Sequence, residues 1–200
     1  KHMLKSEIVR HCSNLDSIYK EIGIHSRIVH ENIIRLFNSV ELENDFYLIM
    51  EYANQGPLCK IITETHGLKE EEAFNYFIQV VNAVYFLQEH NLVHRDIKPE
   101  NILLDANNKA KLSDFGWCCE VELGNRKTFC GTFEYMAPEI IREEPYNKAV
   151  DIWALGILLY EMLYGFSPFK ASENAEDKTK EILTNILTKE PEFLARTSNG

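Results

Sequence analysis

The stretch HRDIKPEN at residues 94–101, followed by DFG at residues 114–116, decides how the rest of this sequence is interpreted. The first stretch places a carboxylate, Asp96, two residues before an ammonium, Lys98, and five before an amide, Asn101. The aspartate that opens DFG adds a second carboxylate. Transfer of a phosphoryl group to a hydroxyl needs such a set, because the migrating group is surrounded by negative oxygens that require a cation and Mg²⁺ ligands. The pattern therefore indicates a phosphoryl-transfer centre.

The spacing of these residues resembles that of eukaryotic protein kinases, whose catalytic loop reads H-R-D-x-x-x-x-N before a D-F-G motif. By this resemblance, Asp96 orients the substrate hydroxyl and accepts its proton. Lys98 lies near the γ-phosphate of ATP, while Asn101 and Asp114 hold Mg²⁺. A lysine two residues after the catalytic aspartate is typical of the serine/threonine type. The resemblance therefore implies an ATP- and Mg²⁺-dependent kinase that phosphorylates Ser/Thr hydroxyls of proteins.

The same resemblance implies an α+β fold with two lobes. We expect residues 1–53 to form part of the small lobe, with a strand end, one helix, an antiparallel strand pair and the hinge. Residues 54–200 should form part of a mainly helical large lobe that carries the catalytic loop, the activation segment and core helices. The sequence shows neither a G-x-G-x-x-G loop nor the closing helices of a kinase domain. We therefore expect a fragment of the family domain.

Candidates for contact with the nucleotide phosphates lie near the start of the sequence. Residues 1–8 are expected to be the end of a strand, and by resemblance Lys1 is the lysine that holds the α- and β-phosphates. Lys5 is its rival. Glu21 precedes His30 by nine residues, which is the spacing of the kinase αC glutamate from its downstream turn. It should pair with the phosphate-binding lysine.

Apolar spacing predicts the elements around these candidates. Ser13 or Asn14 can cap a helix that contains Glu21 and carries Leu15, Ile18, Ile22 and Ile28 on roughly one face. Residues 33–40 and 46–52 are predicted to be two antiparallel strands. A long core helix is predicted from Lys69 to Glu89, with Ala73, Phe77, Val80, Val84 and Leu87 on its apolar face and Phe74, Val81 and Phe86 widening that face.

The residues that follow the strand pair are expected to bind adenine. By resemblance, Glu51 and Ala53 offer a backbone carbonyl and a backbone amide to the base. Leu103 should form the floor under the adenine. It belongs to a short strand at residues 102–104, which is predicted to return through residues 110–112 as a hairpin.

Residues 114–139 have the composition of an activation loop. Thr128 follows two basic residues and is predicted to be a regulatory phosphosite, because Arg95 could pair with the added negative charge. Thr132 is predicted to contact the catalytic aspartate and lysine and to serve substrate binding. Glu100 resembles the acidic position with which basophilic kinases hold an arginine upstream of the phosphorylated residue, although an ordinary surface glutamate is the alternative.

Two further stretches narrow the resemblance. DFGW at residues 114–117 and CGTFEYM at residues 130–136 are similar to the Aurora kinases, whereas CCE at residues 118–120 departs from their usual continuation. Membership of a neighbouring group of basophilic kinases therefore remains an alternative to the Aurora group. A buried helix is predicted around residues 152–160. Asp151, which immediately precedes it, resembles the kinase residue that hydrogen-bonds the backbone of the catalytic loop.

Composition limits the partners. The formal charge is −10, from 21 basic and 31 acidic residues, which disfavours nucleic acid and is compatible with substrates that carry basic residues upstream of Ser/Thr. No apolar run reaches the roughly 20 residues of a membrane span. Five cysteines at irregular spacing suggest an intracellular, reducing compartment, and the resemblance suggests the cytoplasm, the nucleus or the spindle. An activating protein is a further expected partner.

Two rival functions remain open. The first is a catalytically silent pseudokinase or scaffold that keeps the fold for binding. The intact set of Asp96, Lys98, Asn101 and Asp114 argues against it. The second is a small-molecule phosphotransferase of the same fold, which the APE motif at residues 137–139 and the peptide-binding loop before it disfavour.

Overall fold

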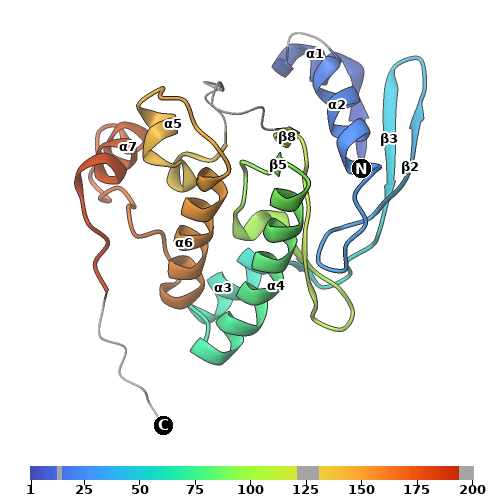
Figure 1. The fold of residues 1–200 in the computed structure, drawn as a ribbon. Helices are drawn as coiled ribbons and strands as arrows, with labels where there is room; N and C mark the ends of the chain where they lie inside the picture. Colours follow the sequence, from blue (N-terminus) through green and yellow to red (C-terminus); the bar gives the residue numbers. More distant parts are fainter. Residues whose placement is uncertain (13–14, 121–130, 194–200) are drawn as a thin grey trace.

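A computed structural model describes residues 1–12, 15–120 and 131–193, with only the backbone at residues 11 and 12. The N-terminal part contains one three-stranded antiparallel sheet with the strand order β1-β3-β2. These strands span His2–Leu4, Leu36–Glu41 and Asp45–Met50, and they pack with helices α1 (Lys5–Cys12) and α2 (Asp16–His25). Figure 1 shows this group, in blue and cyan, beside a larger and mainly helical part.

The larger part is built on two long helices, α4 (Glu70–Glu89) and α6 (Ala149–Tyr164), which contact each other. Three further helices surround them: α3 (Leu58–Thr65), α5 (Pro138–Ile141) and α7 (Lys178–Thr188). Helix α4 begins with three glutamates, which stabilise the positive end of its dipole. The arrangement confirms the predicted α+β fold of two parts, while the boundary at residue 53 stays a prediction.

Five short strands, β4 to β8, form two further small sheets among the described residues. A second sheet has the order β4-β6-β7, and strand β5 pairs with β8. Strand β4 spans Gly56–Pro57, β5 spans Leu92–Val93, β6 spans Ile102–Leu104, β7 spans Ala110–Leu112 and β8 spans Cys119–Glu120. The predicted β6–β7 hairpin is present, with Leu103 opposite Lys111. In addition, 3-10 turns lie at Pro99–Asn101 and Phe133–Tyr135.

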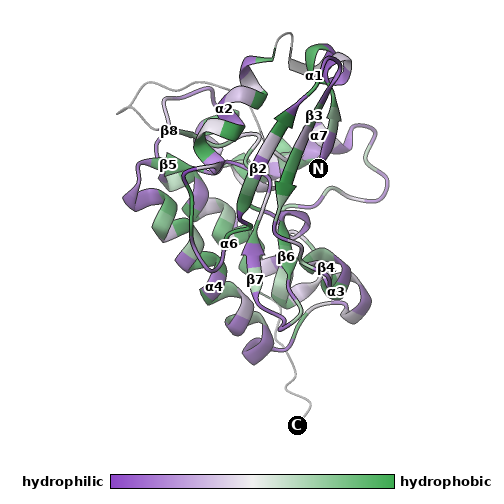
Figure 2. Cartoon of the chain, turned by 90° about the vertical axis from the view of Figure 1, so that its right-hand side faces the viewer, coloured by the Kyte–Doolittle hydropathy of each residue, from purple (hydrophilic) through white to green (hydrophobic). Residues whose placement is uncertain are grey.

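The apolar core lies between α4, α6 and the short strands. Helix α4 buries Ala73, Val80, Val84 and Leu87, as its apolar spacing predicts. Its outward face carries polar side chains together with the exposed Phe74, Ile78 and Tyr85. Both hydrophilic and hydrophobic colours run along the helix in Figure 2. The prediction was wrong for Phe74, whose side chain is 60% exposed. Among the described residues, no helix is both long and apolar enough to cross a membrane.

Local predictions failed at three places. Residues 5–8 were expected to end a strand but begin helix α1. Helix α3 was not predicted, because only Leu58 and Ile62 of its residues are buried and its apolar signal is short. Helix α2 ends at His25, before the expected Ile28. The predicted cap at residues 13 and 14 lies outside the described residues.

Candidate active site

The catalytic loop is held in place by the side chain of Asp151, at the start of α6. Its two carboxylate oxygens accept the backbone N–H groups of His94 and Arg95 at 2.8 and 2.9 Å. Asp151 is fully buried, and burial raises its pKa to about 6. Arg95 adopts a left-handed backbone conformation with φ 68°, which a non-glycine residue rarely does. The predicted contact between Asp151 and the loop backbone is therefore present, and it fixes an unfavourable turn.

Asp96 lies at the centre of a closely bonded group. Asn101 Nδ2 donates to Asp96 Oδ2 and to the Asp96 carbonyl, at 2.8 Å in both cases. Lys98 Nζ lies 3.0 Å from Asp96 Oδ2 and donates to Thr132 Oγ1 at 2.7 Å. The Thr132 hydroxyl in turn donates to Asp96 Oδ1 at 3.0 Å. These contacts bring together the four residues that the sequence predicted to meet there, although they lie up to 36 residues apart.

A second charged group joins Lys1 and Glu21 of the N-terminal part to Asp114. Lys1 Nζ lies 3.1 Å from Glu21 Oε1 and 3.3 Å from Asp114 Oδ1. Lys5 instead pairs with Glu41 at 2.6 Å. The lysine that meets the αC-like glutamate is thus Lys1, and the expected ion pair with Glu21 is present.

Burial and charge act against each other in this group. Burial by itself would lower the pKa of Lys1, but the charges of Glu21 and Asp114 outweigh it and the pKa is raised. Burial would raise the pKa of Asp114, yet Lys1 brings it below the ordinary value. For Glu21, burial outweighs Lys1 and the pKa is raised. Lys1 and Asp114 are therefore ionised at neutral pH.

A column of three rings connects the two groups. The rings of His25 and Phe115 stack with centroids 4.4 Å apart, and Phe115 meets His94 edge-on at 5.1 Å. His94 Nδ1 accepts the backbone N–H of Asp96, so its Nε2 donates to the Ser113 carbonyl. Burial lowers the pKa of His25 and brings that of His94 to about 4. Both imidazoles are neutral at pH 7 and pack as aromatic side chains.

The donor atoms around Asp96 and Asp114 suit Mg²⁺. This ion prefers hard oxygen ligands and is commonly held by one or two carboxylates together with phosphate oxygens. The side chain of Asp114 is 46% exposed, so its carboxylate is accessible to a cation. The amide nitrogen of Asn101 is committed to Asp96, which leaves its amide oxygen as the ligand atom. The residues present therefore fit the metal that the sequence implied.

The expected adenine-contacting residues lie where the two parts of the chain meet. The Glu51 amide donates to the Arg35 carbonyl at 2.8 Å, and the Glu51 carboxylate contacts Lys111 at 2.7 Å. Ala53 is half-buried in the segment after β3, and Leu103 is half-buried in β6. Their roles toward adenine stay predictions.

Three carboxylates, those of Glu100, Glu134 and Glu161, interact electrostatically with one another. Burial raises the pKa of Glu134, and the nearby charge of Glu100 raises it further. Burial also raises the pKa of Glu161, with the Tyr135 hydroxyl opposing and Glu100 adding to the rise. The sequence pointed only to Glu100. Nothing local marks Glu134 or Glu161, because the three come together only in the folded chain.

Two predicted regulatory features have different outcomes. Thr128 lies outside the described residues, so its role stays a prediction. Arg95, its expected partner, donates to the Trp117 carbonyl and to the Tyr146 hydroxyl, both at 2.7 Å. The guanidinium thus lies against the start of the activation segment.

The sequence pattern of the protein kinase domain matches residues 1–198. The chain is 40% identical to an Aurora kinase of Yarrowia lipolytica over 184 residues, which cover 92% of this chain and 49% of that protein. It is 39% identical to Aurora kinase C of Mus musculus over 177 residues, covering 88% and 63%. It is 40% identical to serine/threonine-protein kinase Aurora-2 of Arabidopsis thaliana over 157 residues, covering 78% and 55%. The chain thus spans about half the length of these curated relatives.

Proposed function

The chain belongs to the protein kinase domain family, and we propose that the protein containing it is an active serine/threonine kinase. It would transfer the γ-phosphate of ATP to Ser/Thr hydroxyls of protein substrates, as its similarity to Aurora kinases suggests. The observation that carries the proposal is the convergence of Asp96, Lys98 and Asn101 in one hydrogen-bonded group. This group is joined to the segment of Asp114 where the Ser113 N–H donates to the Asn101 carbonyl at 2.8 Å, and Asp114 in turn pairs with Lys1.

Each residue of this group has a role in the proposed reaction. Asp96 positions the substrate hydroxyl and accepts its proton, because its carboxylate lies at the centre of the loop. Lys98 holds positive charge beside it, where negative charge develops on the migrating group. Lys1 binds the nucleotide phosphates and is itself oriented by Glu21. Mg²⁺, held by Asn101 and Asp114, would neutralise charge on the phosphate oxygens.

The proposal that the acceptor residue is serine or threonine rests on Lys98 in the catalytic loop. Lys98 lies two residues after the catalytic aspartate and contacts both Asp96 and Thr132. This arrangement links the catalytic carboxylate to the loop that would receive the substrate peptide. The relative from Arabidopsis thaliana, serine/threonine-protein kinase Aurora-2, is named for the same type of kinase.

A preference for basic residues upstream of the acceptor follows from a group of three carboxylates. Glu100, Glu134 and Glu161 influence one another electrostatically, and their mutual repulsion favours a bound cation. An arginine guanidinium forms paired hydrogen bonds with carboxylates, so it is the best-suited side chain. We assign these three residues to recognition of a substrate arginine.

Regulation and location are part of the same proposal. Phosphorylation of Thr128 would add negative charge close in sequence to the segment that Arg95 contacts, and an activating protein would stabilise the ordered loop. We place the protein inside the cell, in the cytoplasm, the nucleus or at the spindle. These points rest on the sequence resemblance and on the named relatives.

Peptide phosphorylation by the full-length protein tests the proposal. A serine peptide with arginine upstream is compared with the same peptide carrying alanine there, and with one carrying tyrosine in place of serine. We expect Mg²⁺-dependent transfer that is strongest for the first peptide and absent for the tyrosine peptide. Binding of Mg·ATP without any transfer would instead favour the silent scaffold. Equal rates with and without arginine would refute the assigned arginine site.

A further inference from the structure

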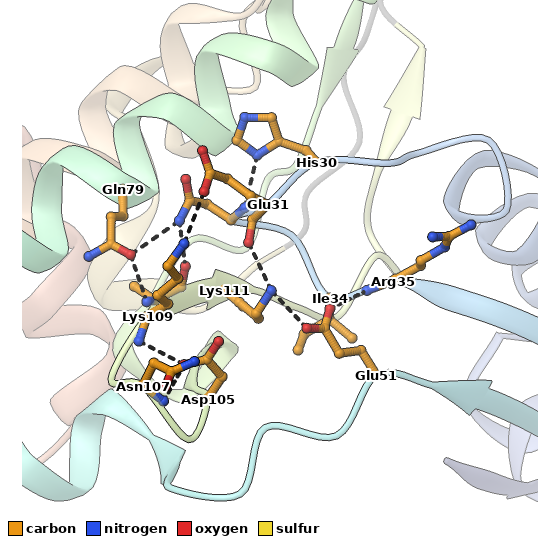
Figure 3. A network of polar contacts seen from close by, with 12 residues as sticks. His30, Glu31, Ile34, Arg35, Glu51, Gln79, Asp105, Asn107, Lys109 and Lys111 are labelled. Carbon is orange, nitrogen blue, oxygen red and sulfur yellow. Dashed lines mark hydrogen bonds and ion pairs between the residues drawn. The ribbon is translucent and has the colours of Figure 1, made fainter.

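Lys111 is a buried cation that the kinase motifs do not explain. It lies in β7, its exposed fraction is 7%, and its ammonium contacts two segments far away in the sequence. Lys111 Nζ donates to the Glu31 carbonyl at 2.8 Å and pairs with Glu51 Oε1 at 2.7 Å. Figure 3 shows the ammonium between these two oxygens. One side chain thus joins β7, the turn after α2 and the segment after β3.

The partner carboxylate is held from its other side as well. Glu51 Oε2 accepts the Arg35 amide at 3.2 Å, and the Glu51 amide donates to the Arg35 carbonyl at 2.8 Å. The backbone and the side chain of Glu51 are therefore both fixed. The Lys111 contact thus adds a further restraint on the residue whose carbonyl is proposed to meet adenine.

The turn after α2 is fixed to β7 at the same place. Leu112 donates to the Asn32 carbonyl at 2.8 Å, and Ile34 donates to the Leu112 carbonyl at 2.9 Å. The Asn32 side chain donates to the Ala110 carbonyl at 3.0 Å. Strand β7 leads directly to Asp114, and α2 carries Glu21. Lys111 thus lies at the junction of the segments that position both ends of the nucleotide site.

We propose that Lys111 is a positioning residue for nucleotide binding, which fixes the adenine-contacting backbone at Glu51 relative to the strand that leads to Asp114. This inference rests on the proposed ATP-binding function. Lys111 does not touch the nucleotide in this account and acts through Glu51. Its effect should therefore fall on the affinity for Mg·ATP and on KM for ATP, and much less on kcat.

The chain offers a matched control two residues away. Lys109 is also in contact with Glu31, through the side-chain carboxylate at 3.2 Å, but its side chain is 52% exposed and it does not reach Glu51. Exposed ion pairs contribute little to stability. Lys109→Met therefore removes a lysine from the same network without disturbing the segment after β3.

The test uses Lys111→Met, Glu51→Ala, the double variant and Lys111→Arg in the full-length protein. Glu51→Ala leaves the buried Lys111 ammonium without its partner, and Lys111→Met does the same to the half-buried Glu51 carboxylate, so both should lower the unfolding midpoint, the first more than the second. The double variant removes both charges and should recover much of that midpoint. Its Kd for Mg·ATP, measured by calorimetry, should nevertheless stay roughly five- to tenfold above wild type. Lys111→Arg should restore the wild-type affinity, because a guanidinium can donate to both oxygens.

The outcomes distinguish a failure of the proposed ATP-binding function from a failure of the positioning role of Lys111. If the wild type does not bind Mg·ATP, the proposed function fails. If the wild type binds and the stable double variant binds equally well, the function stands and the positioning role of Lys111 is refuted. A fall in kcat with unchanged ATP affinity would refute it too, as would an effect of Lys109→Met as large as that of the double variant.

Discussion

The hydroxyl of Thr132 donates to Asp96 Oδ1 at 3.0 Å and accepts the Lys98 ammonium at 2.7 Å. A residue of the activation segment is thereby bonded to the two residues at the centre of the catalytic loop. These bonds therefore fix the segment that would receive a peptide relative to the carboxylate that would accept its proton.

Replacing this hydroxyl should impair transfer to peptide. In Thr132→Val the side chain keeps its shape but can neither donate to Asp96 nor accept from Lys98. We expect kcat/KM for a basic serine peptide to fall roughly ten- to hundredfold, because the loop loses its fixed position. Steady-state assays with varied peptide measure this. Thr132→Ser keeps the hydroxyl and should stay close to wild type; an equal loss in both variants would show that the hydroxyl is not the cause.

The two N-terminal lysines should differ sharply. Lys1→Met removes the cation between Glu21 and Asp114, and we expect kcat/KM for ATP to fall about a hundredfold or more. Lys5→Met removes a pair with Glu41 and a contact with the Phe46 ring, neither of which involves Glu21 or Asp114, and should leave ATP kinetics unchanged. ATP titrations with both full-length variants make the comparison. Greater damage from Lys5→Met would reverse the assignment of the phosphate-binding lysine.

Loss of Asp151 should destabilise the fold. Asp151→Ala leaves the buried N–H groups of His94 and Arg95 without an acceptor, at a cost of about 1–3 kcal/mol each. Asp105→Ala is a matched control, because Asp105 also accepts two backbone N–H groups but in an exposed turn. We expect its cost to be about 1 kcal/mol or less. Urea unfolding measures both, and equal costs would contradict the assigned role of burial.

Stability should fall on mild acidification. The pKa of His94 is about 4 in the folded chain and near 6.5 in the unfolded chain. Below about pH 6.5 the unfolded chain therefore binds more protons and is stabilised relative to the folded chain. His25, whose pKa is also lowered, acts in the same direction. Asp151 acts oppositely below about pH 6, because its folded pKa is raised to about 6.

The loss should therefore be steepest between about pH 6.5 and 6 and become shallower below that. His25→Gln removes one of the two contributing groups and should flatten the slope, which urea midpoints across this range would show. Stability that rose steadily from pH 7 to pH 6, or a slope that did not change in His25→Gln, would contradict this account.

Motif spacing predicted the catalytic loop well because its function is local. Asp96, Lys98 and Asn101 lie within six residues of each other, so their relative positions follow from the backbone of one turn. Apolar periodicity likewise predicted α4, and Asn91 after it has a left-handed conformation with φ 57°, which a small polar side chain tolerates. The strand pair β2–β3 was found from its two apolar runs.

Other features depend on contacts that no local pattern records. Helix α1 begins at Lys5, whose ammonium lies 5.1 Å from the Phe46 ring and also pairs with Glu41. These tertiary contacts are made at the residue where helix α1 begins, although a strand was expected there. The choice of Lys1 over Lys5 also needed the fold, since only the fold shows which lysine meets Glu21. The cluster around Glu100 and the buried Lys111 arise from segments distant in sequence.

The central claim is that Asp96 performs the chemistry of phosphoryl transfer at a site built to bind Mg·ATP. A single-turnover measurement of γ-phosphate transfer to a basic serine peptide, with full-length wild type and Asp96→Asn, tests it most directly. The account predicts that Asp96→Asn binds Mg·ATP as tightly as wild type while transfer slows by roughly 10²–10⁴-fold. Transfer by Asp96→Asn at the wild-type rate would contradict it.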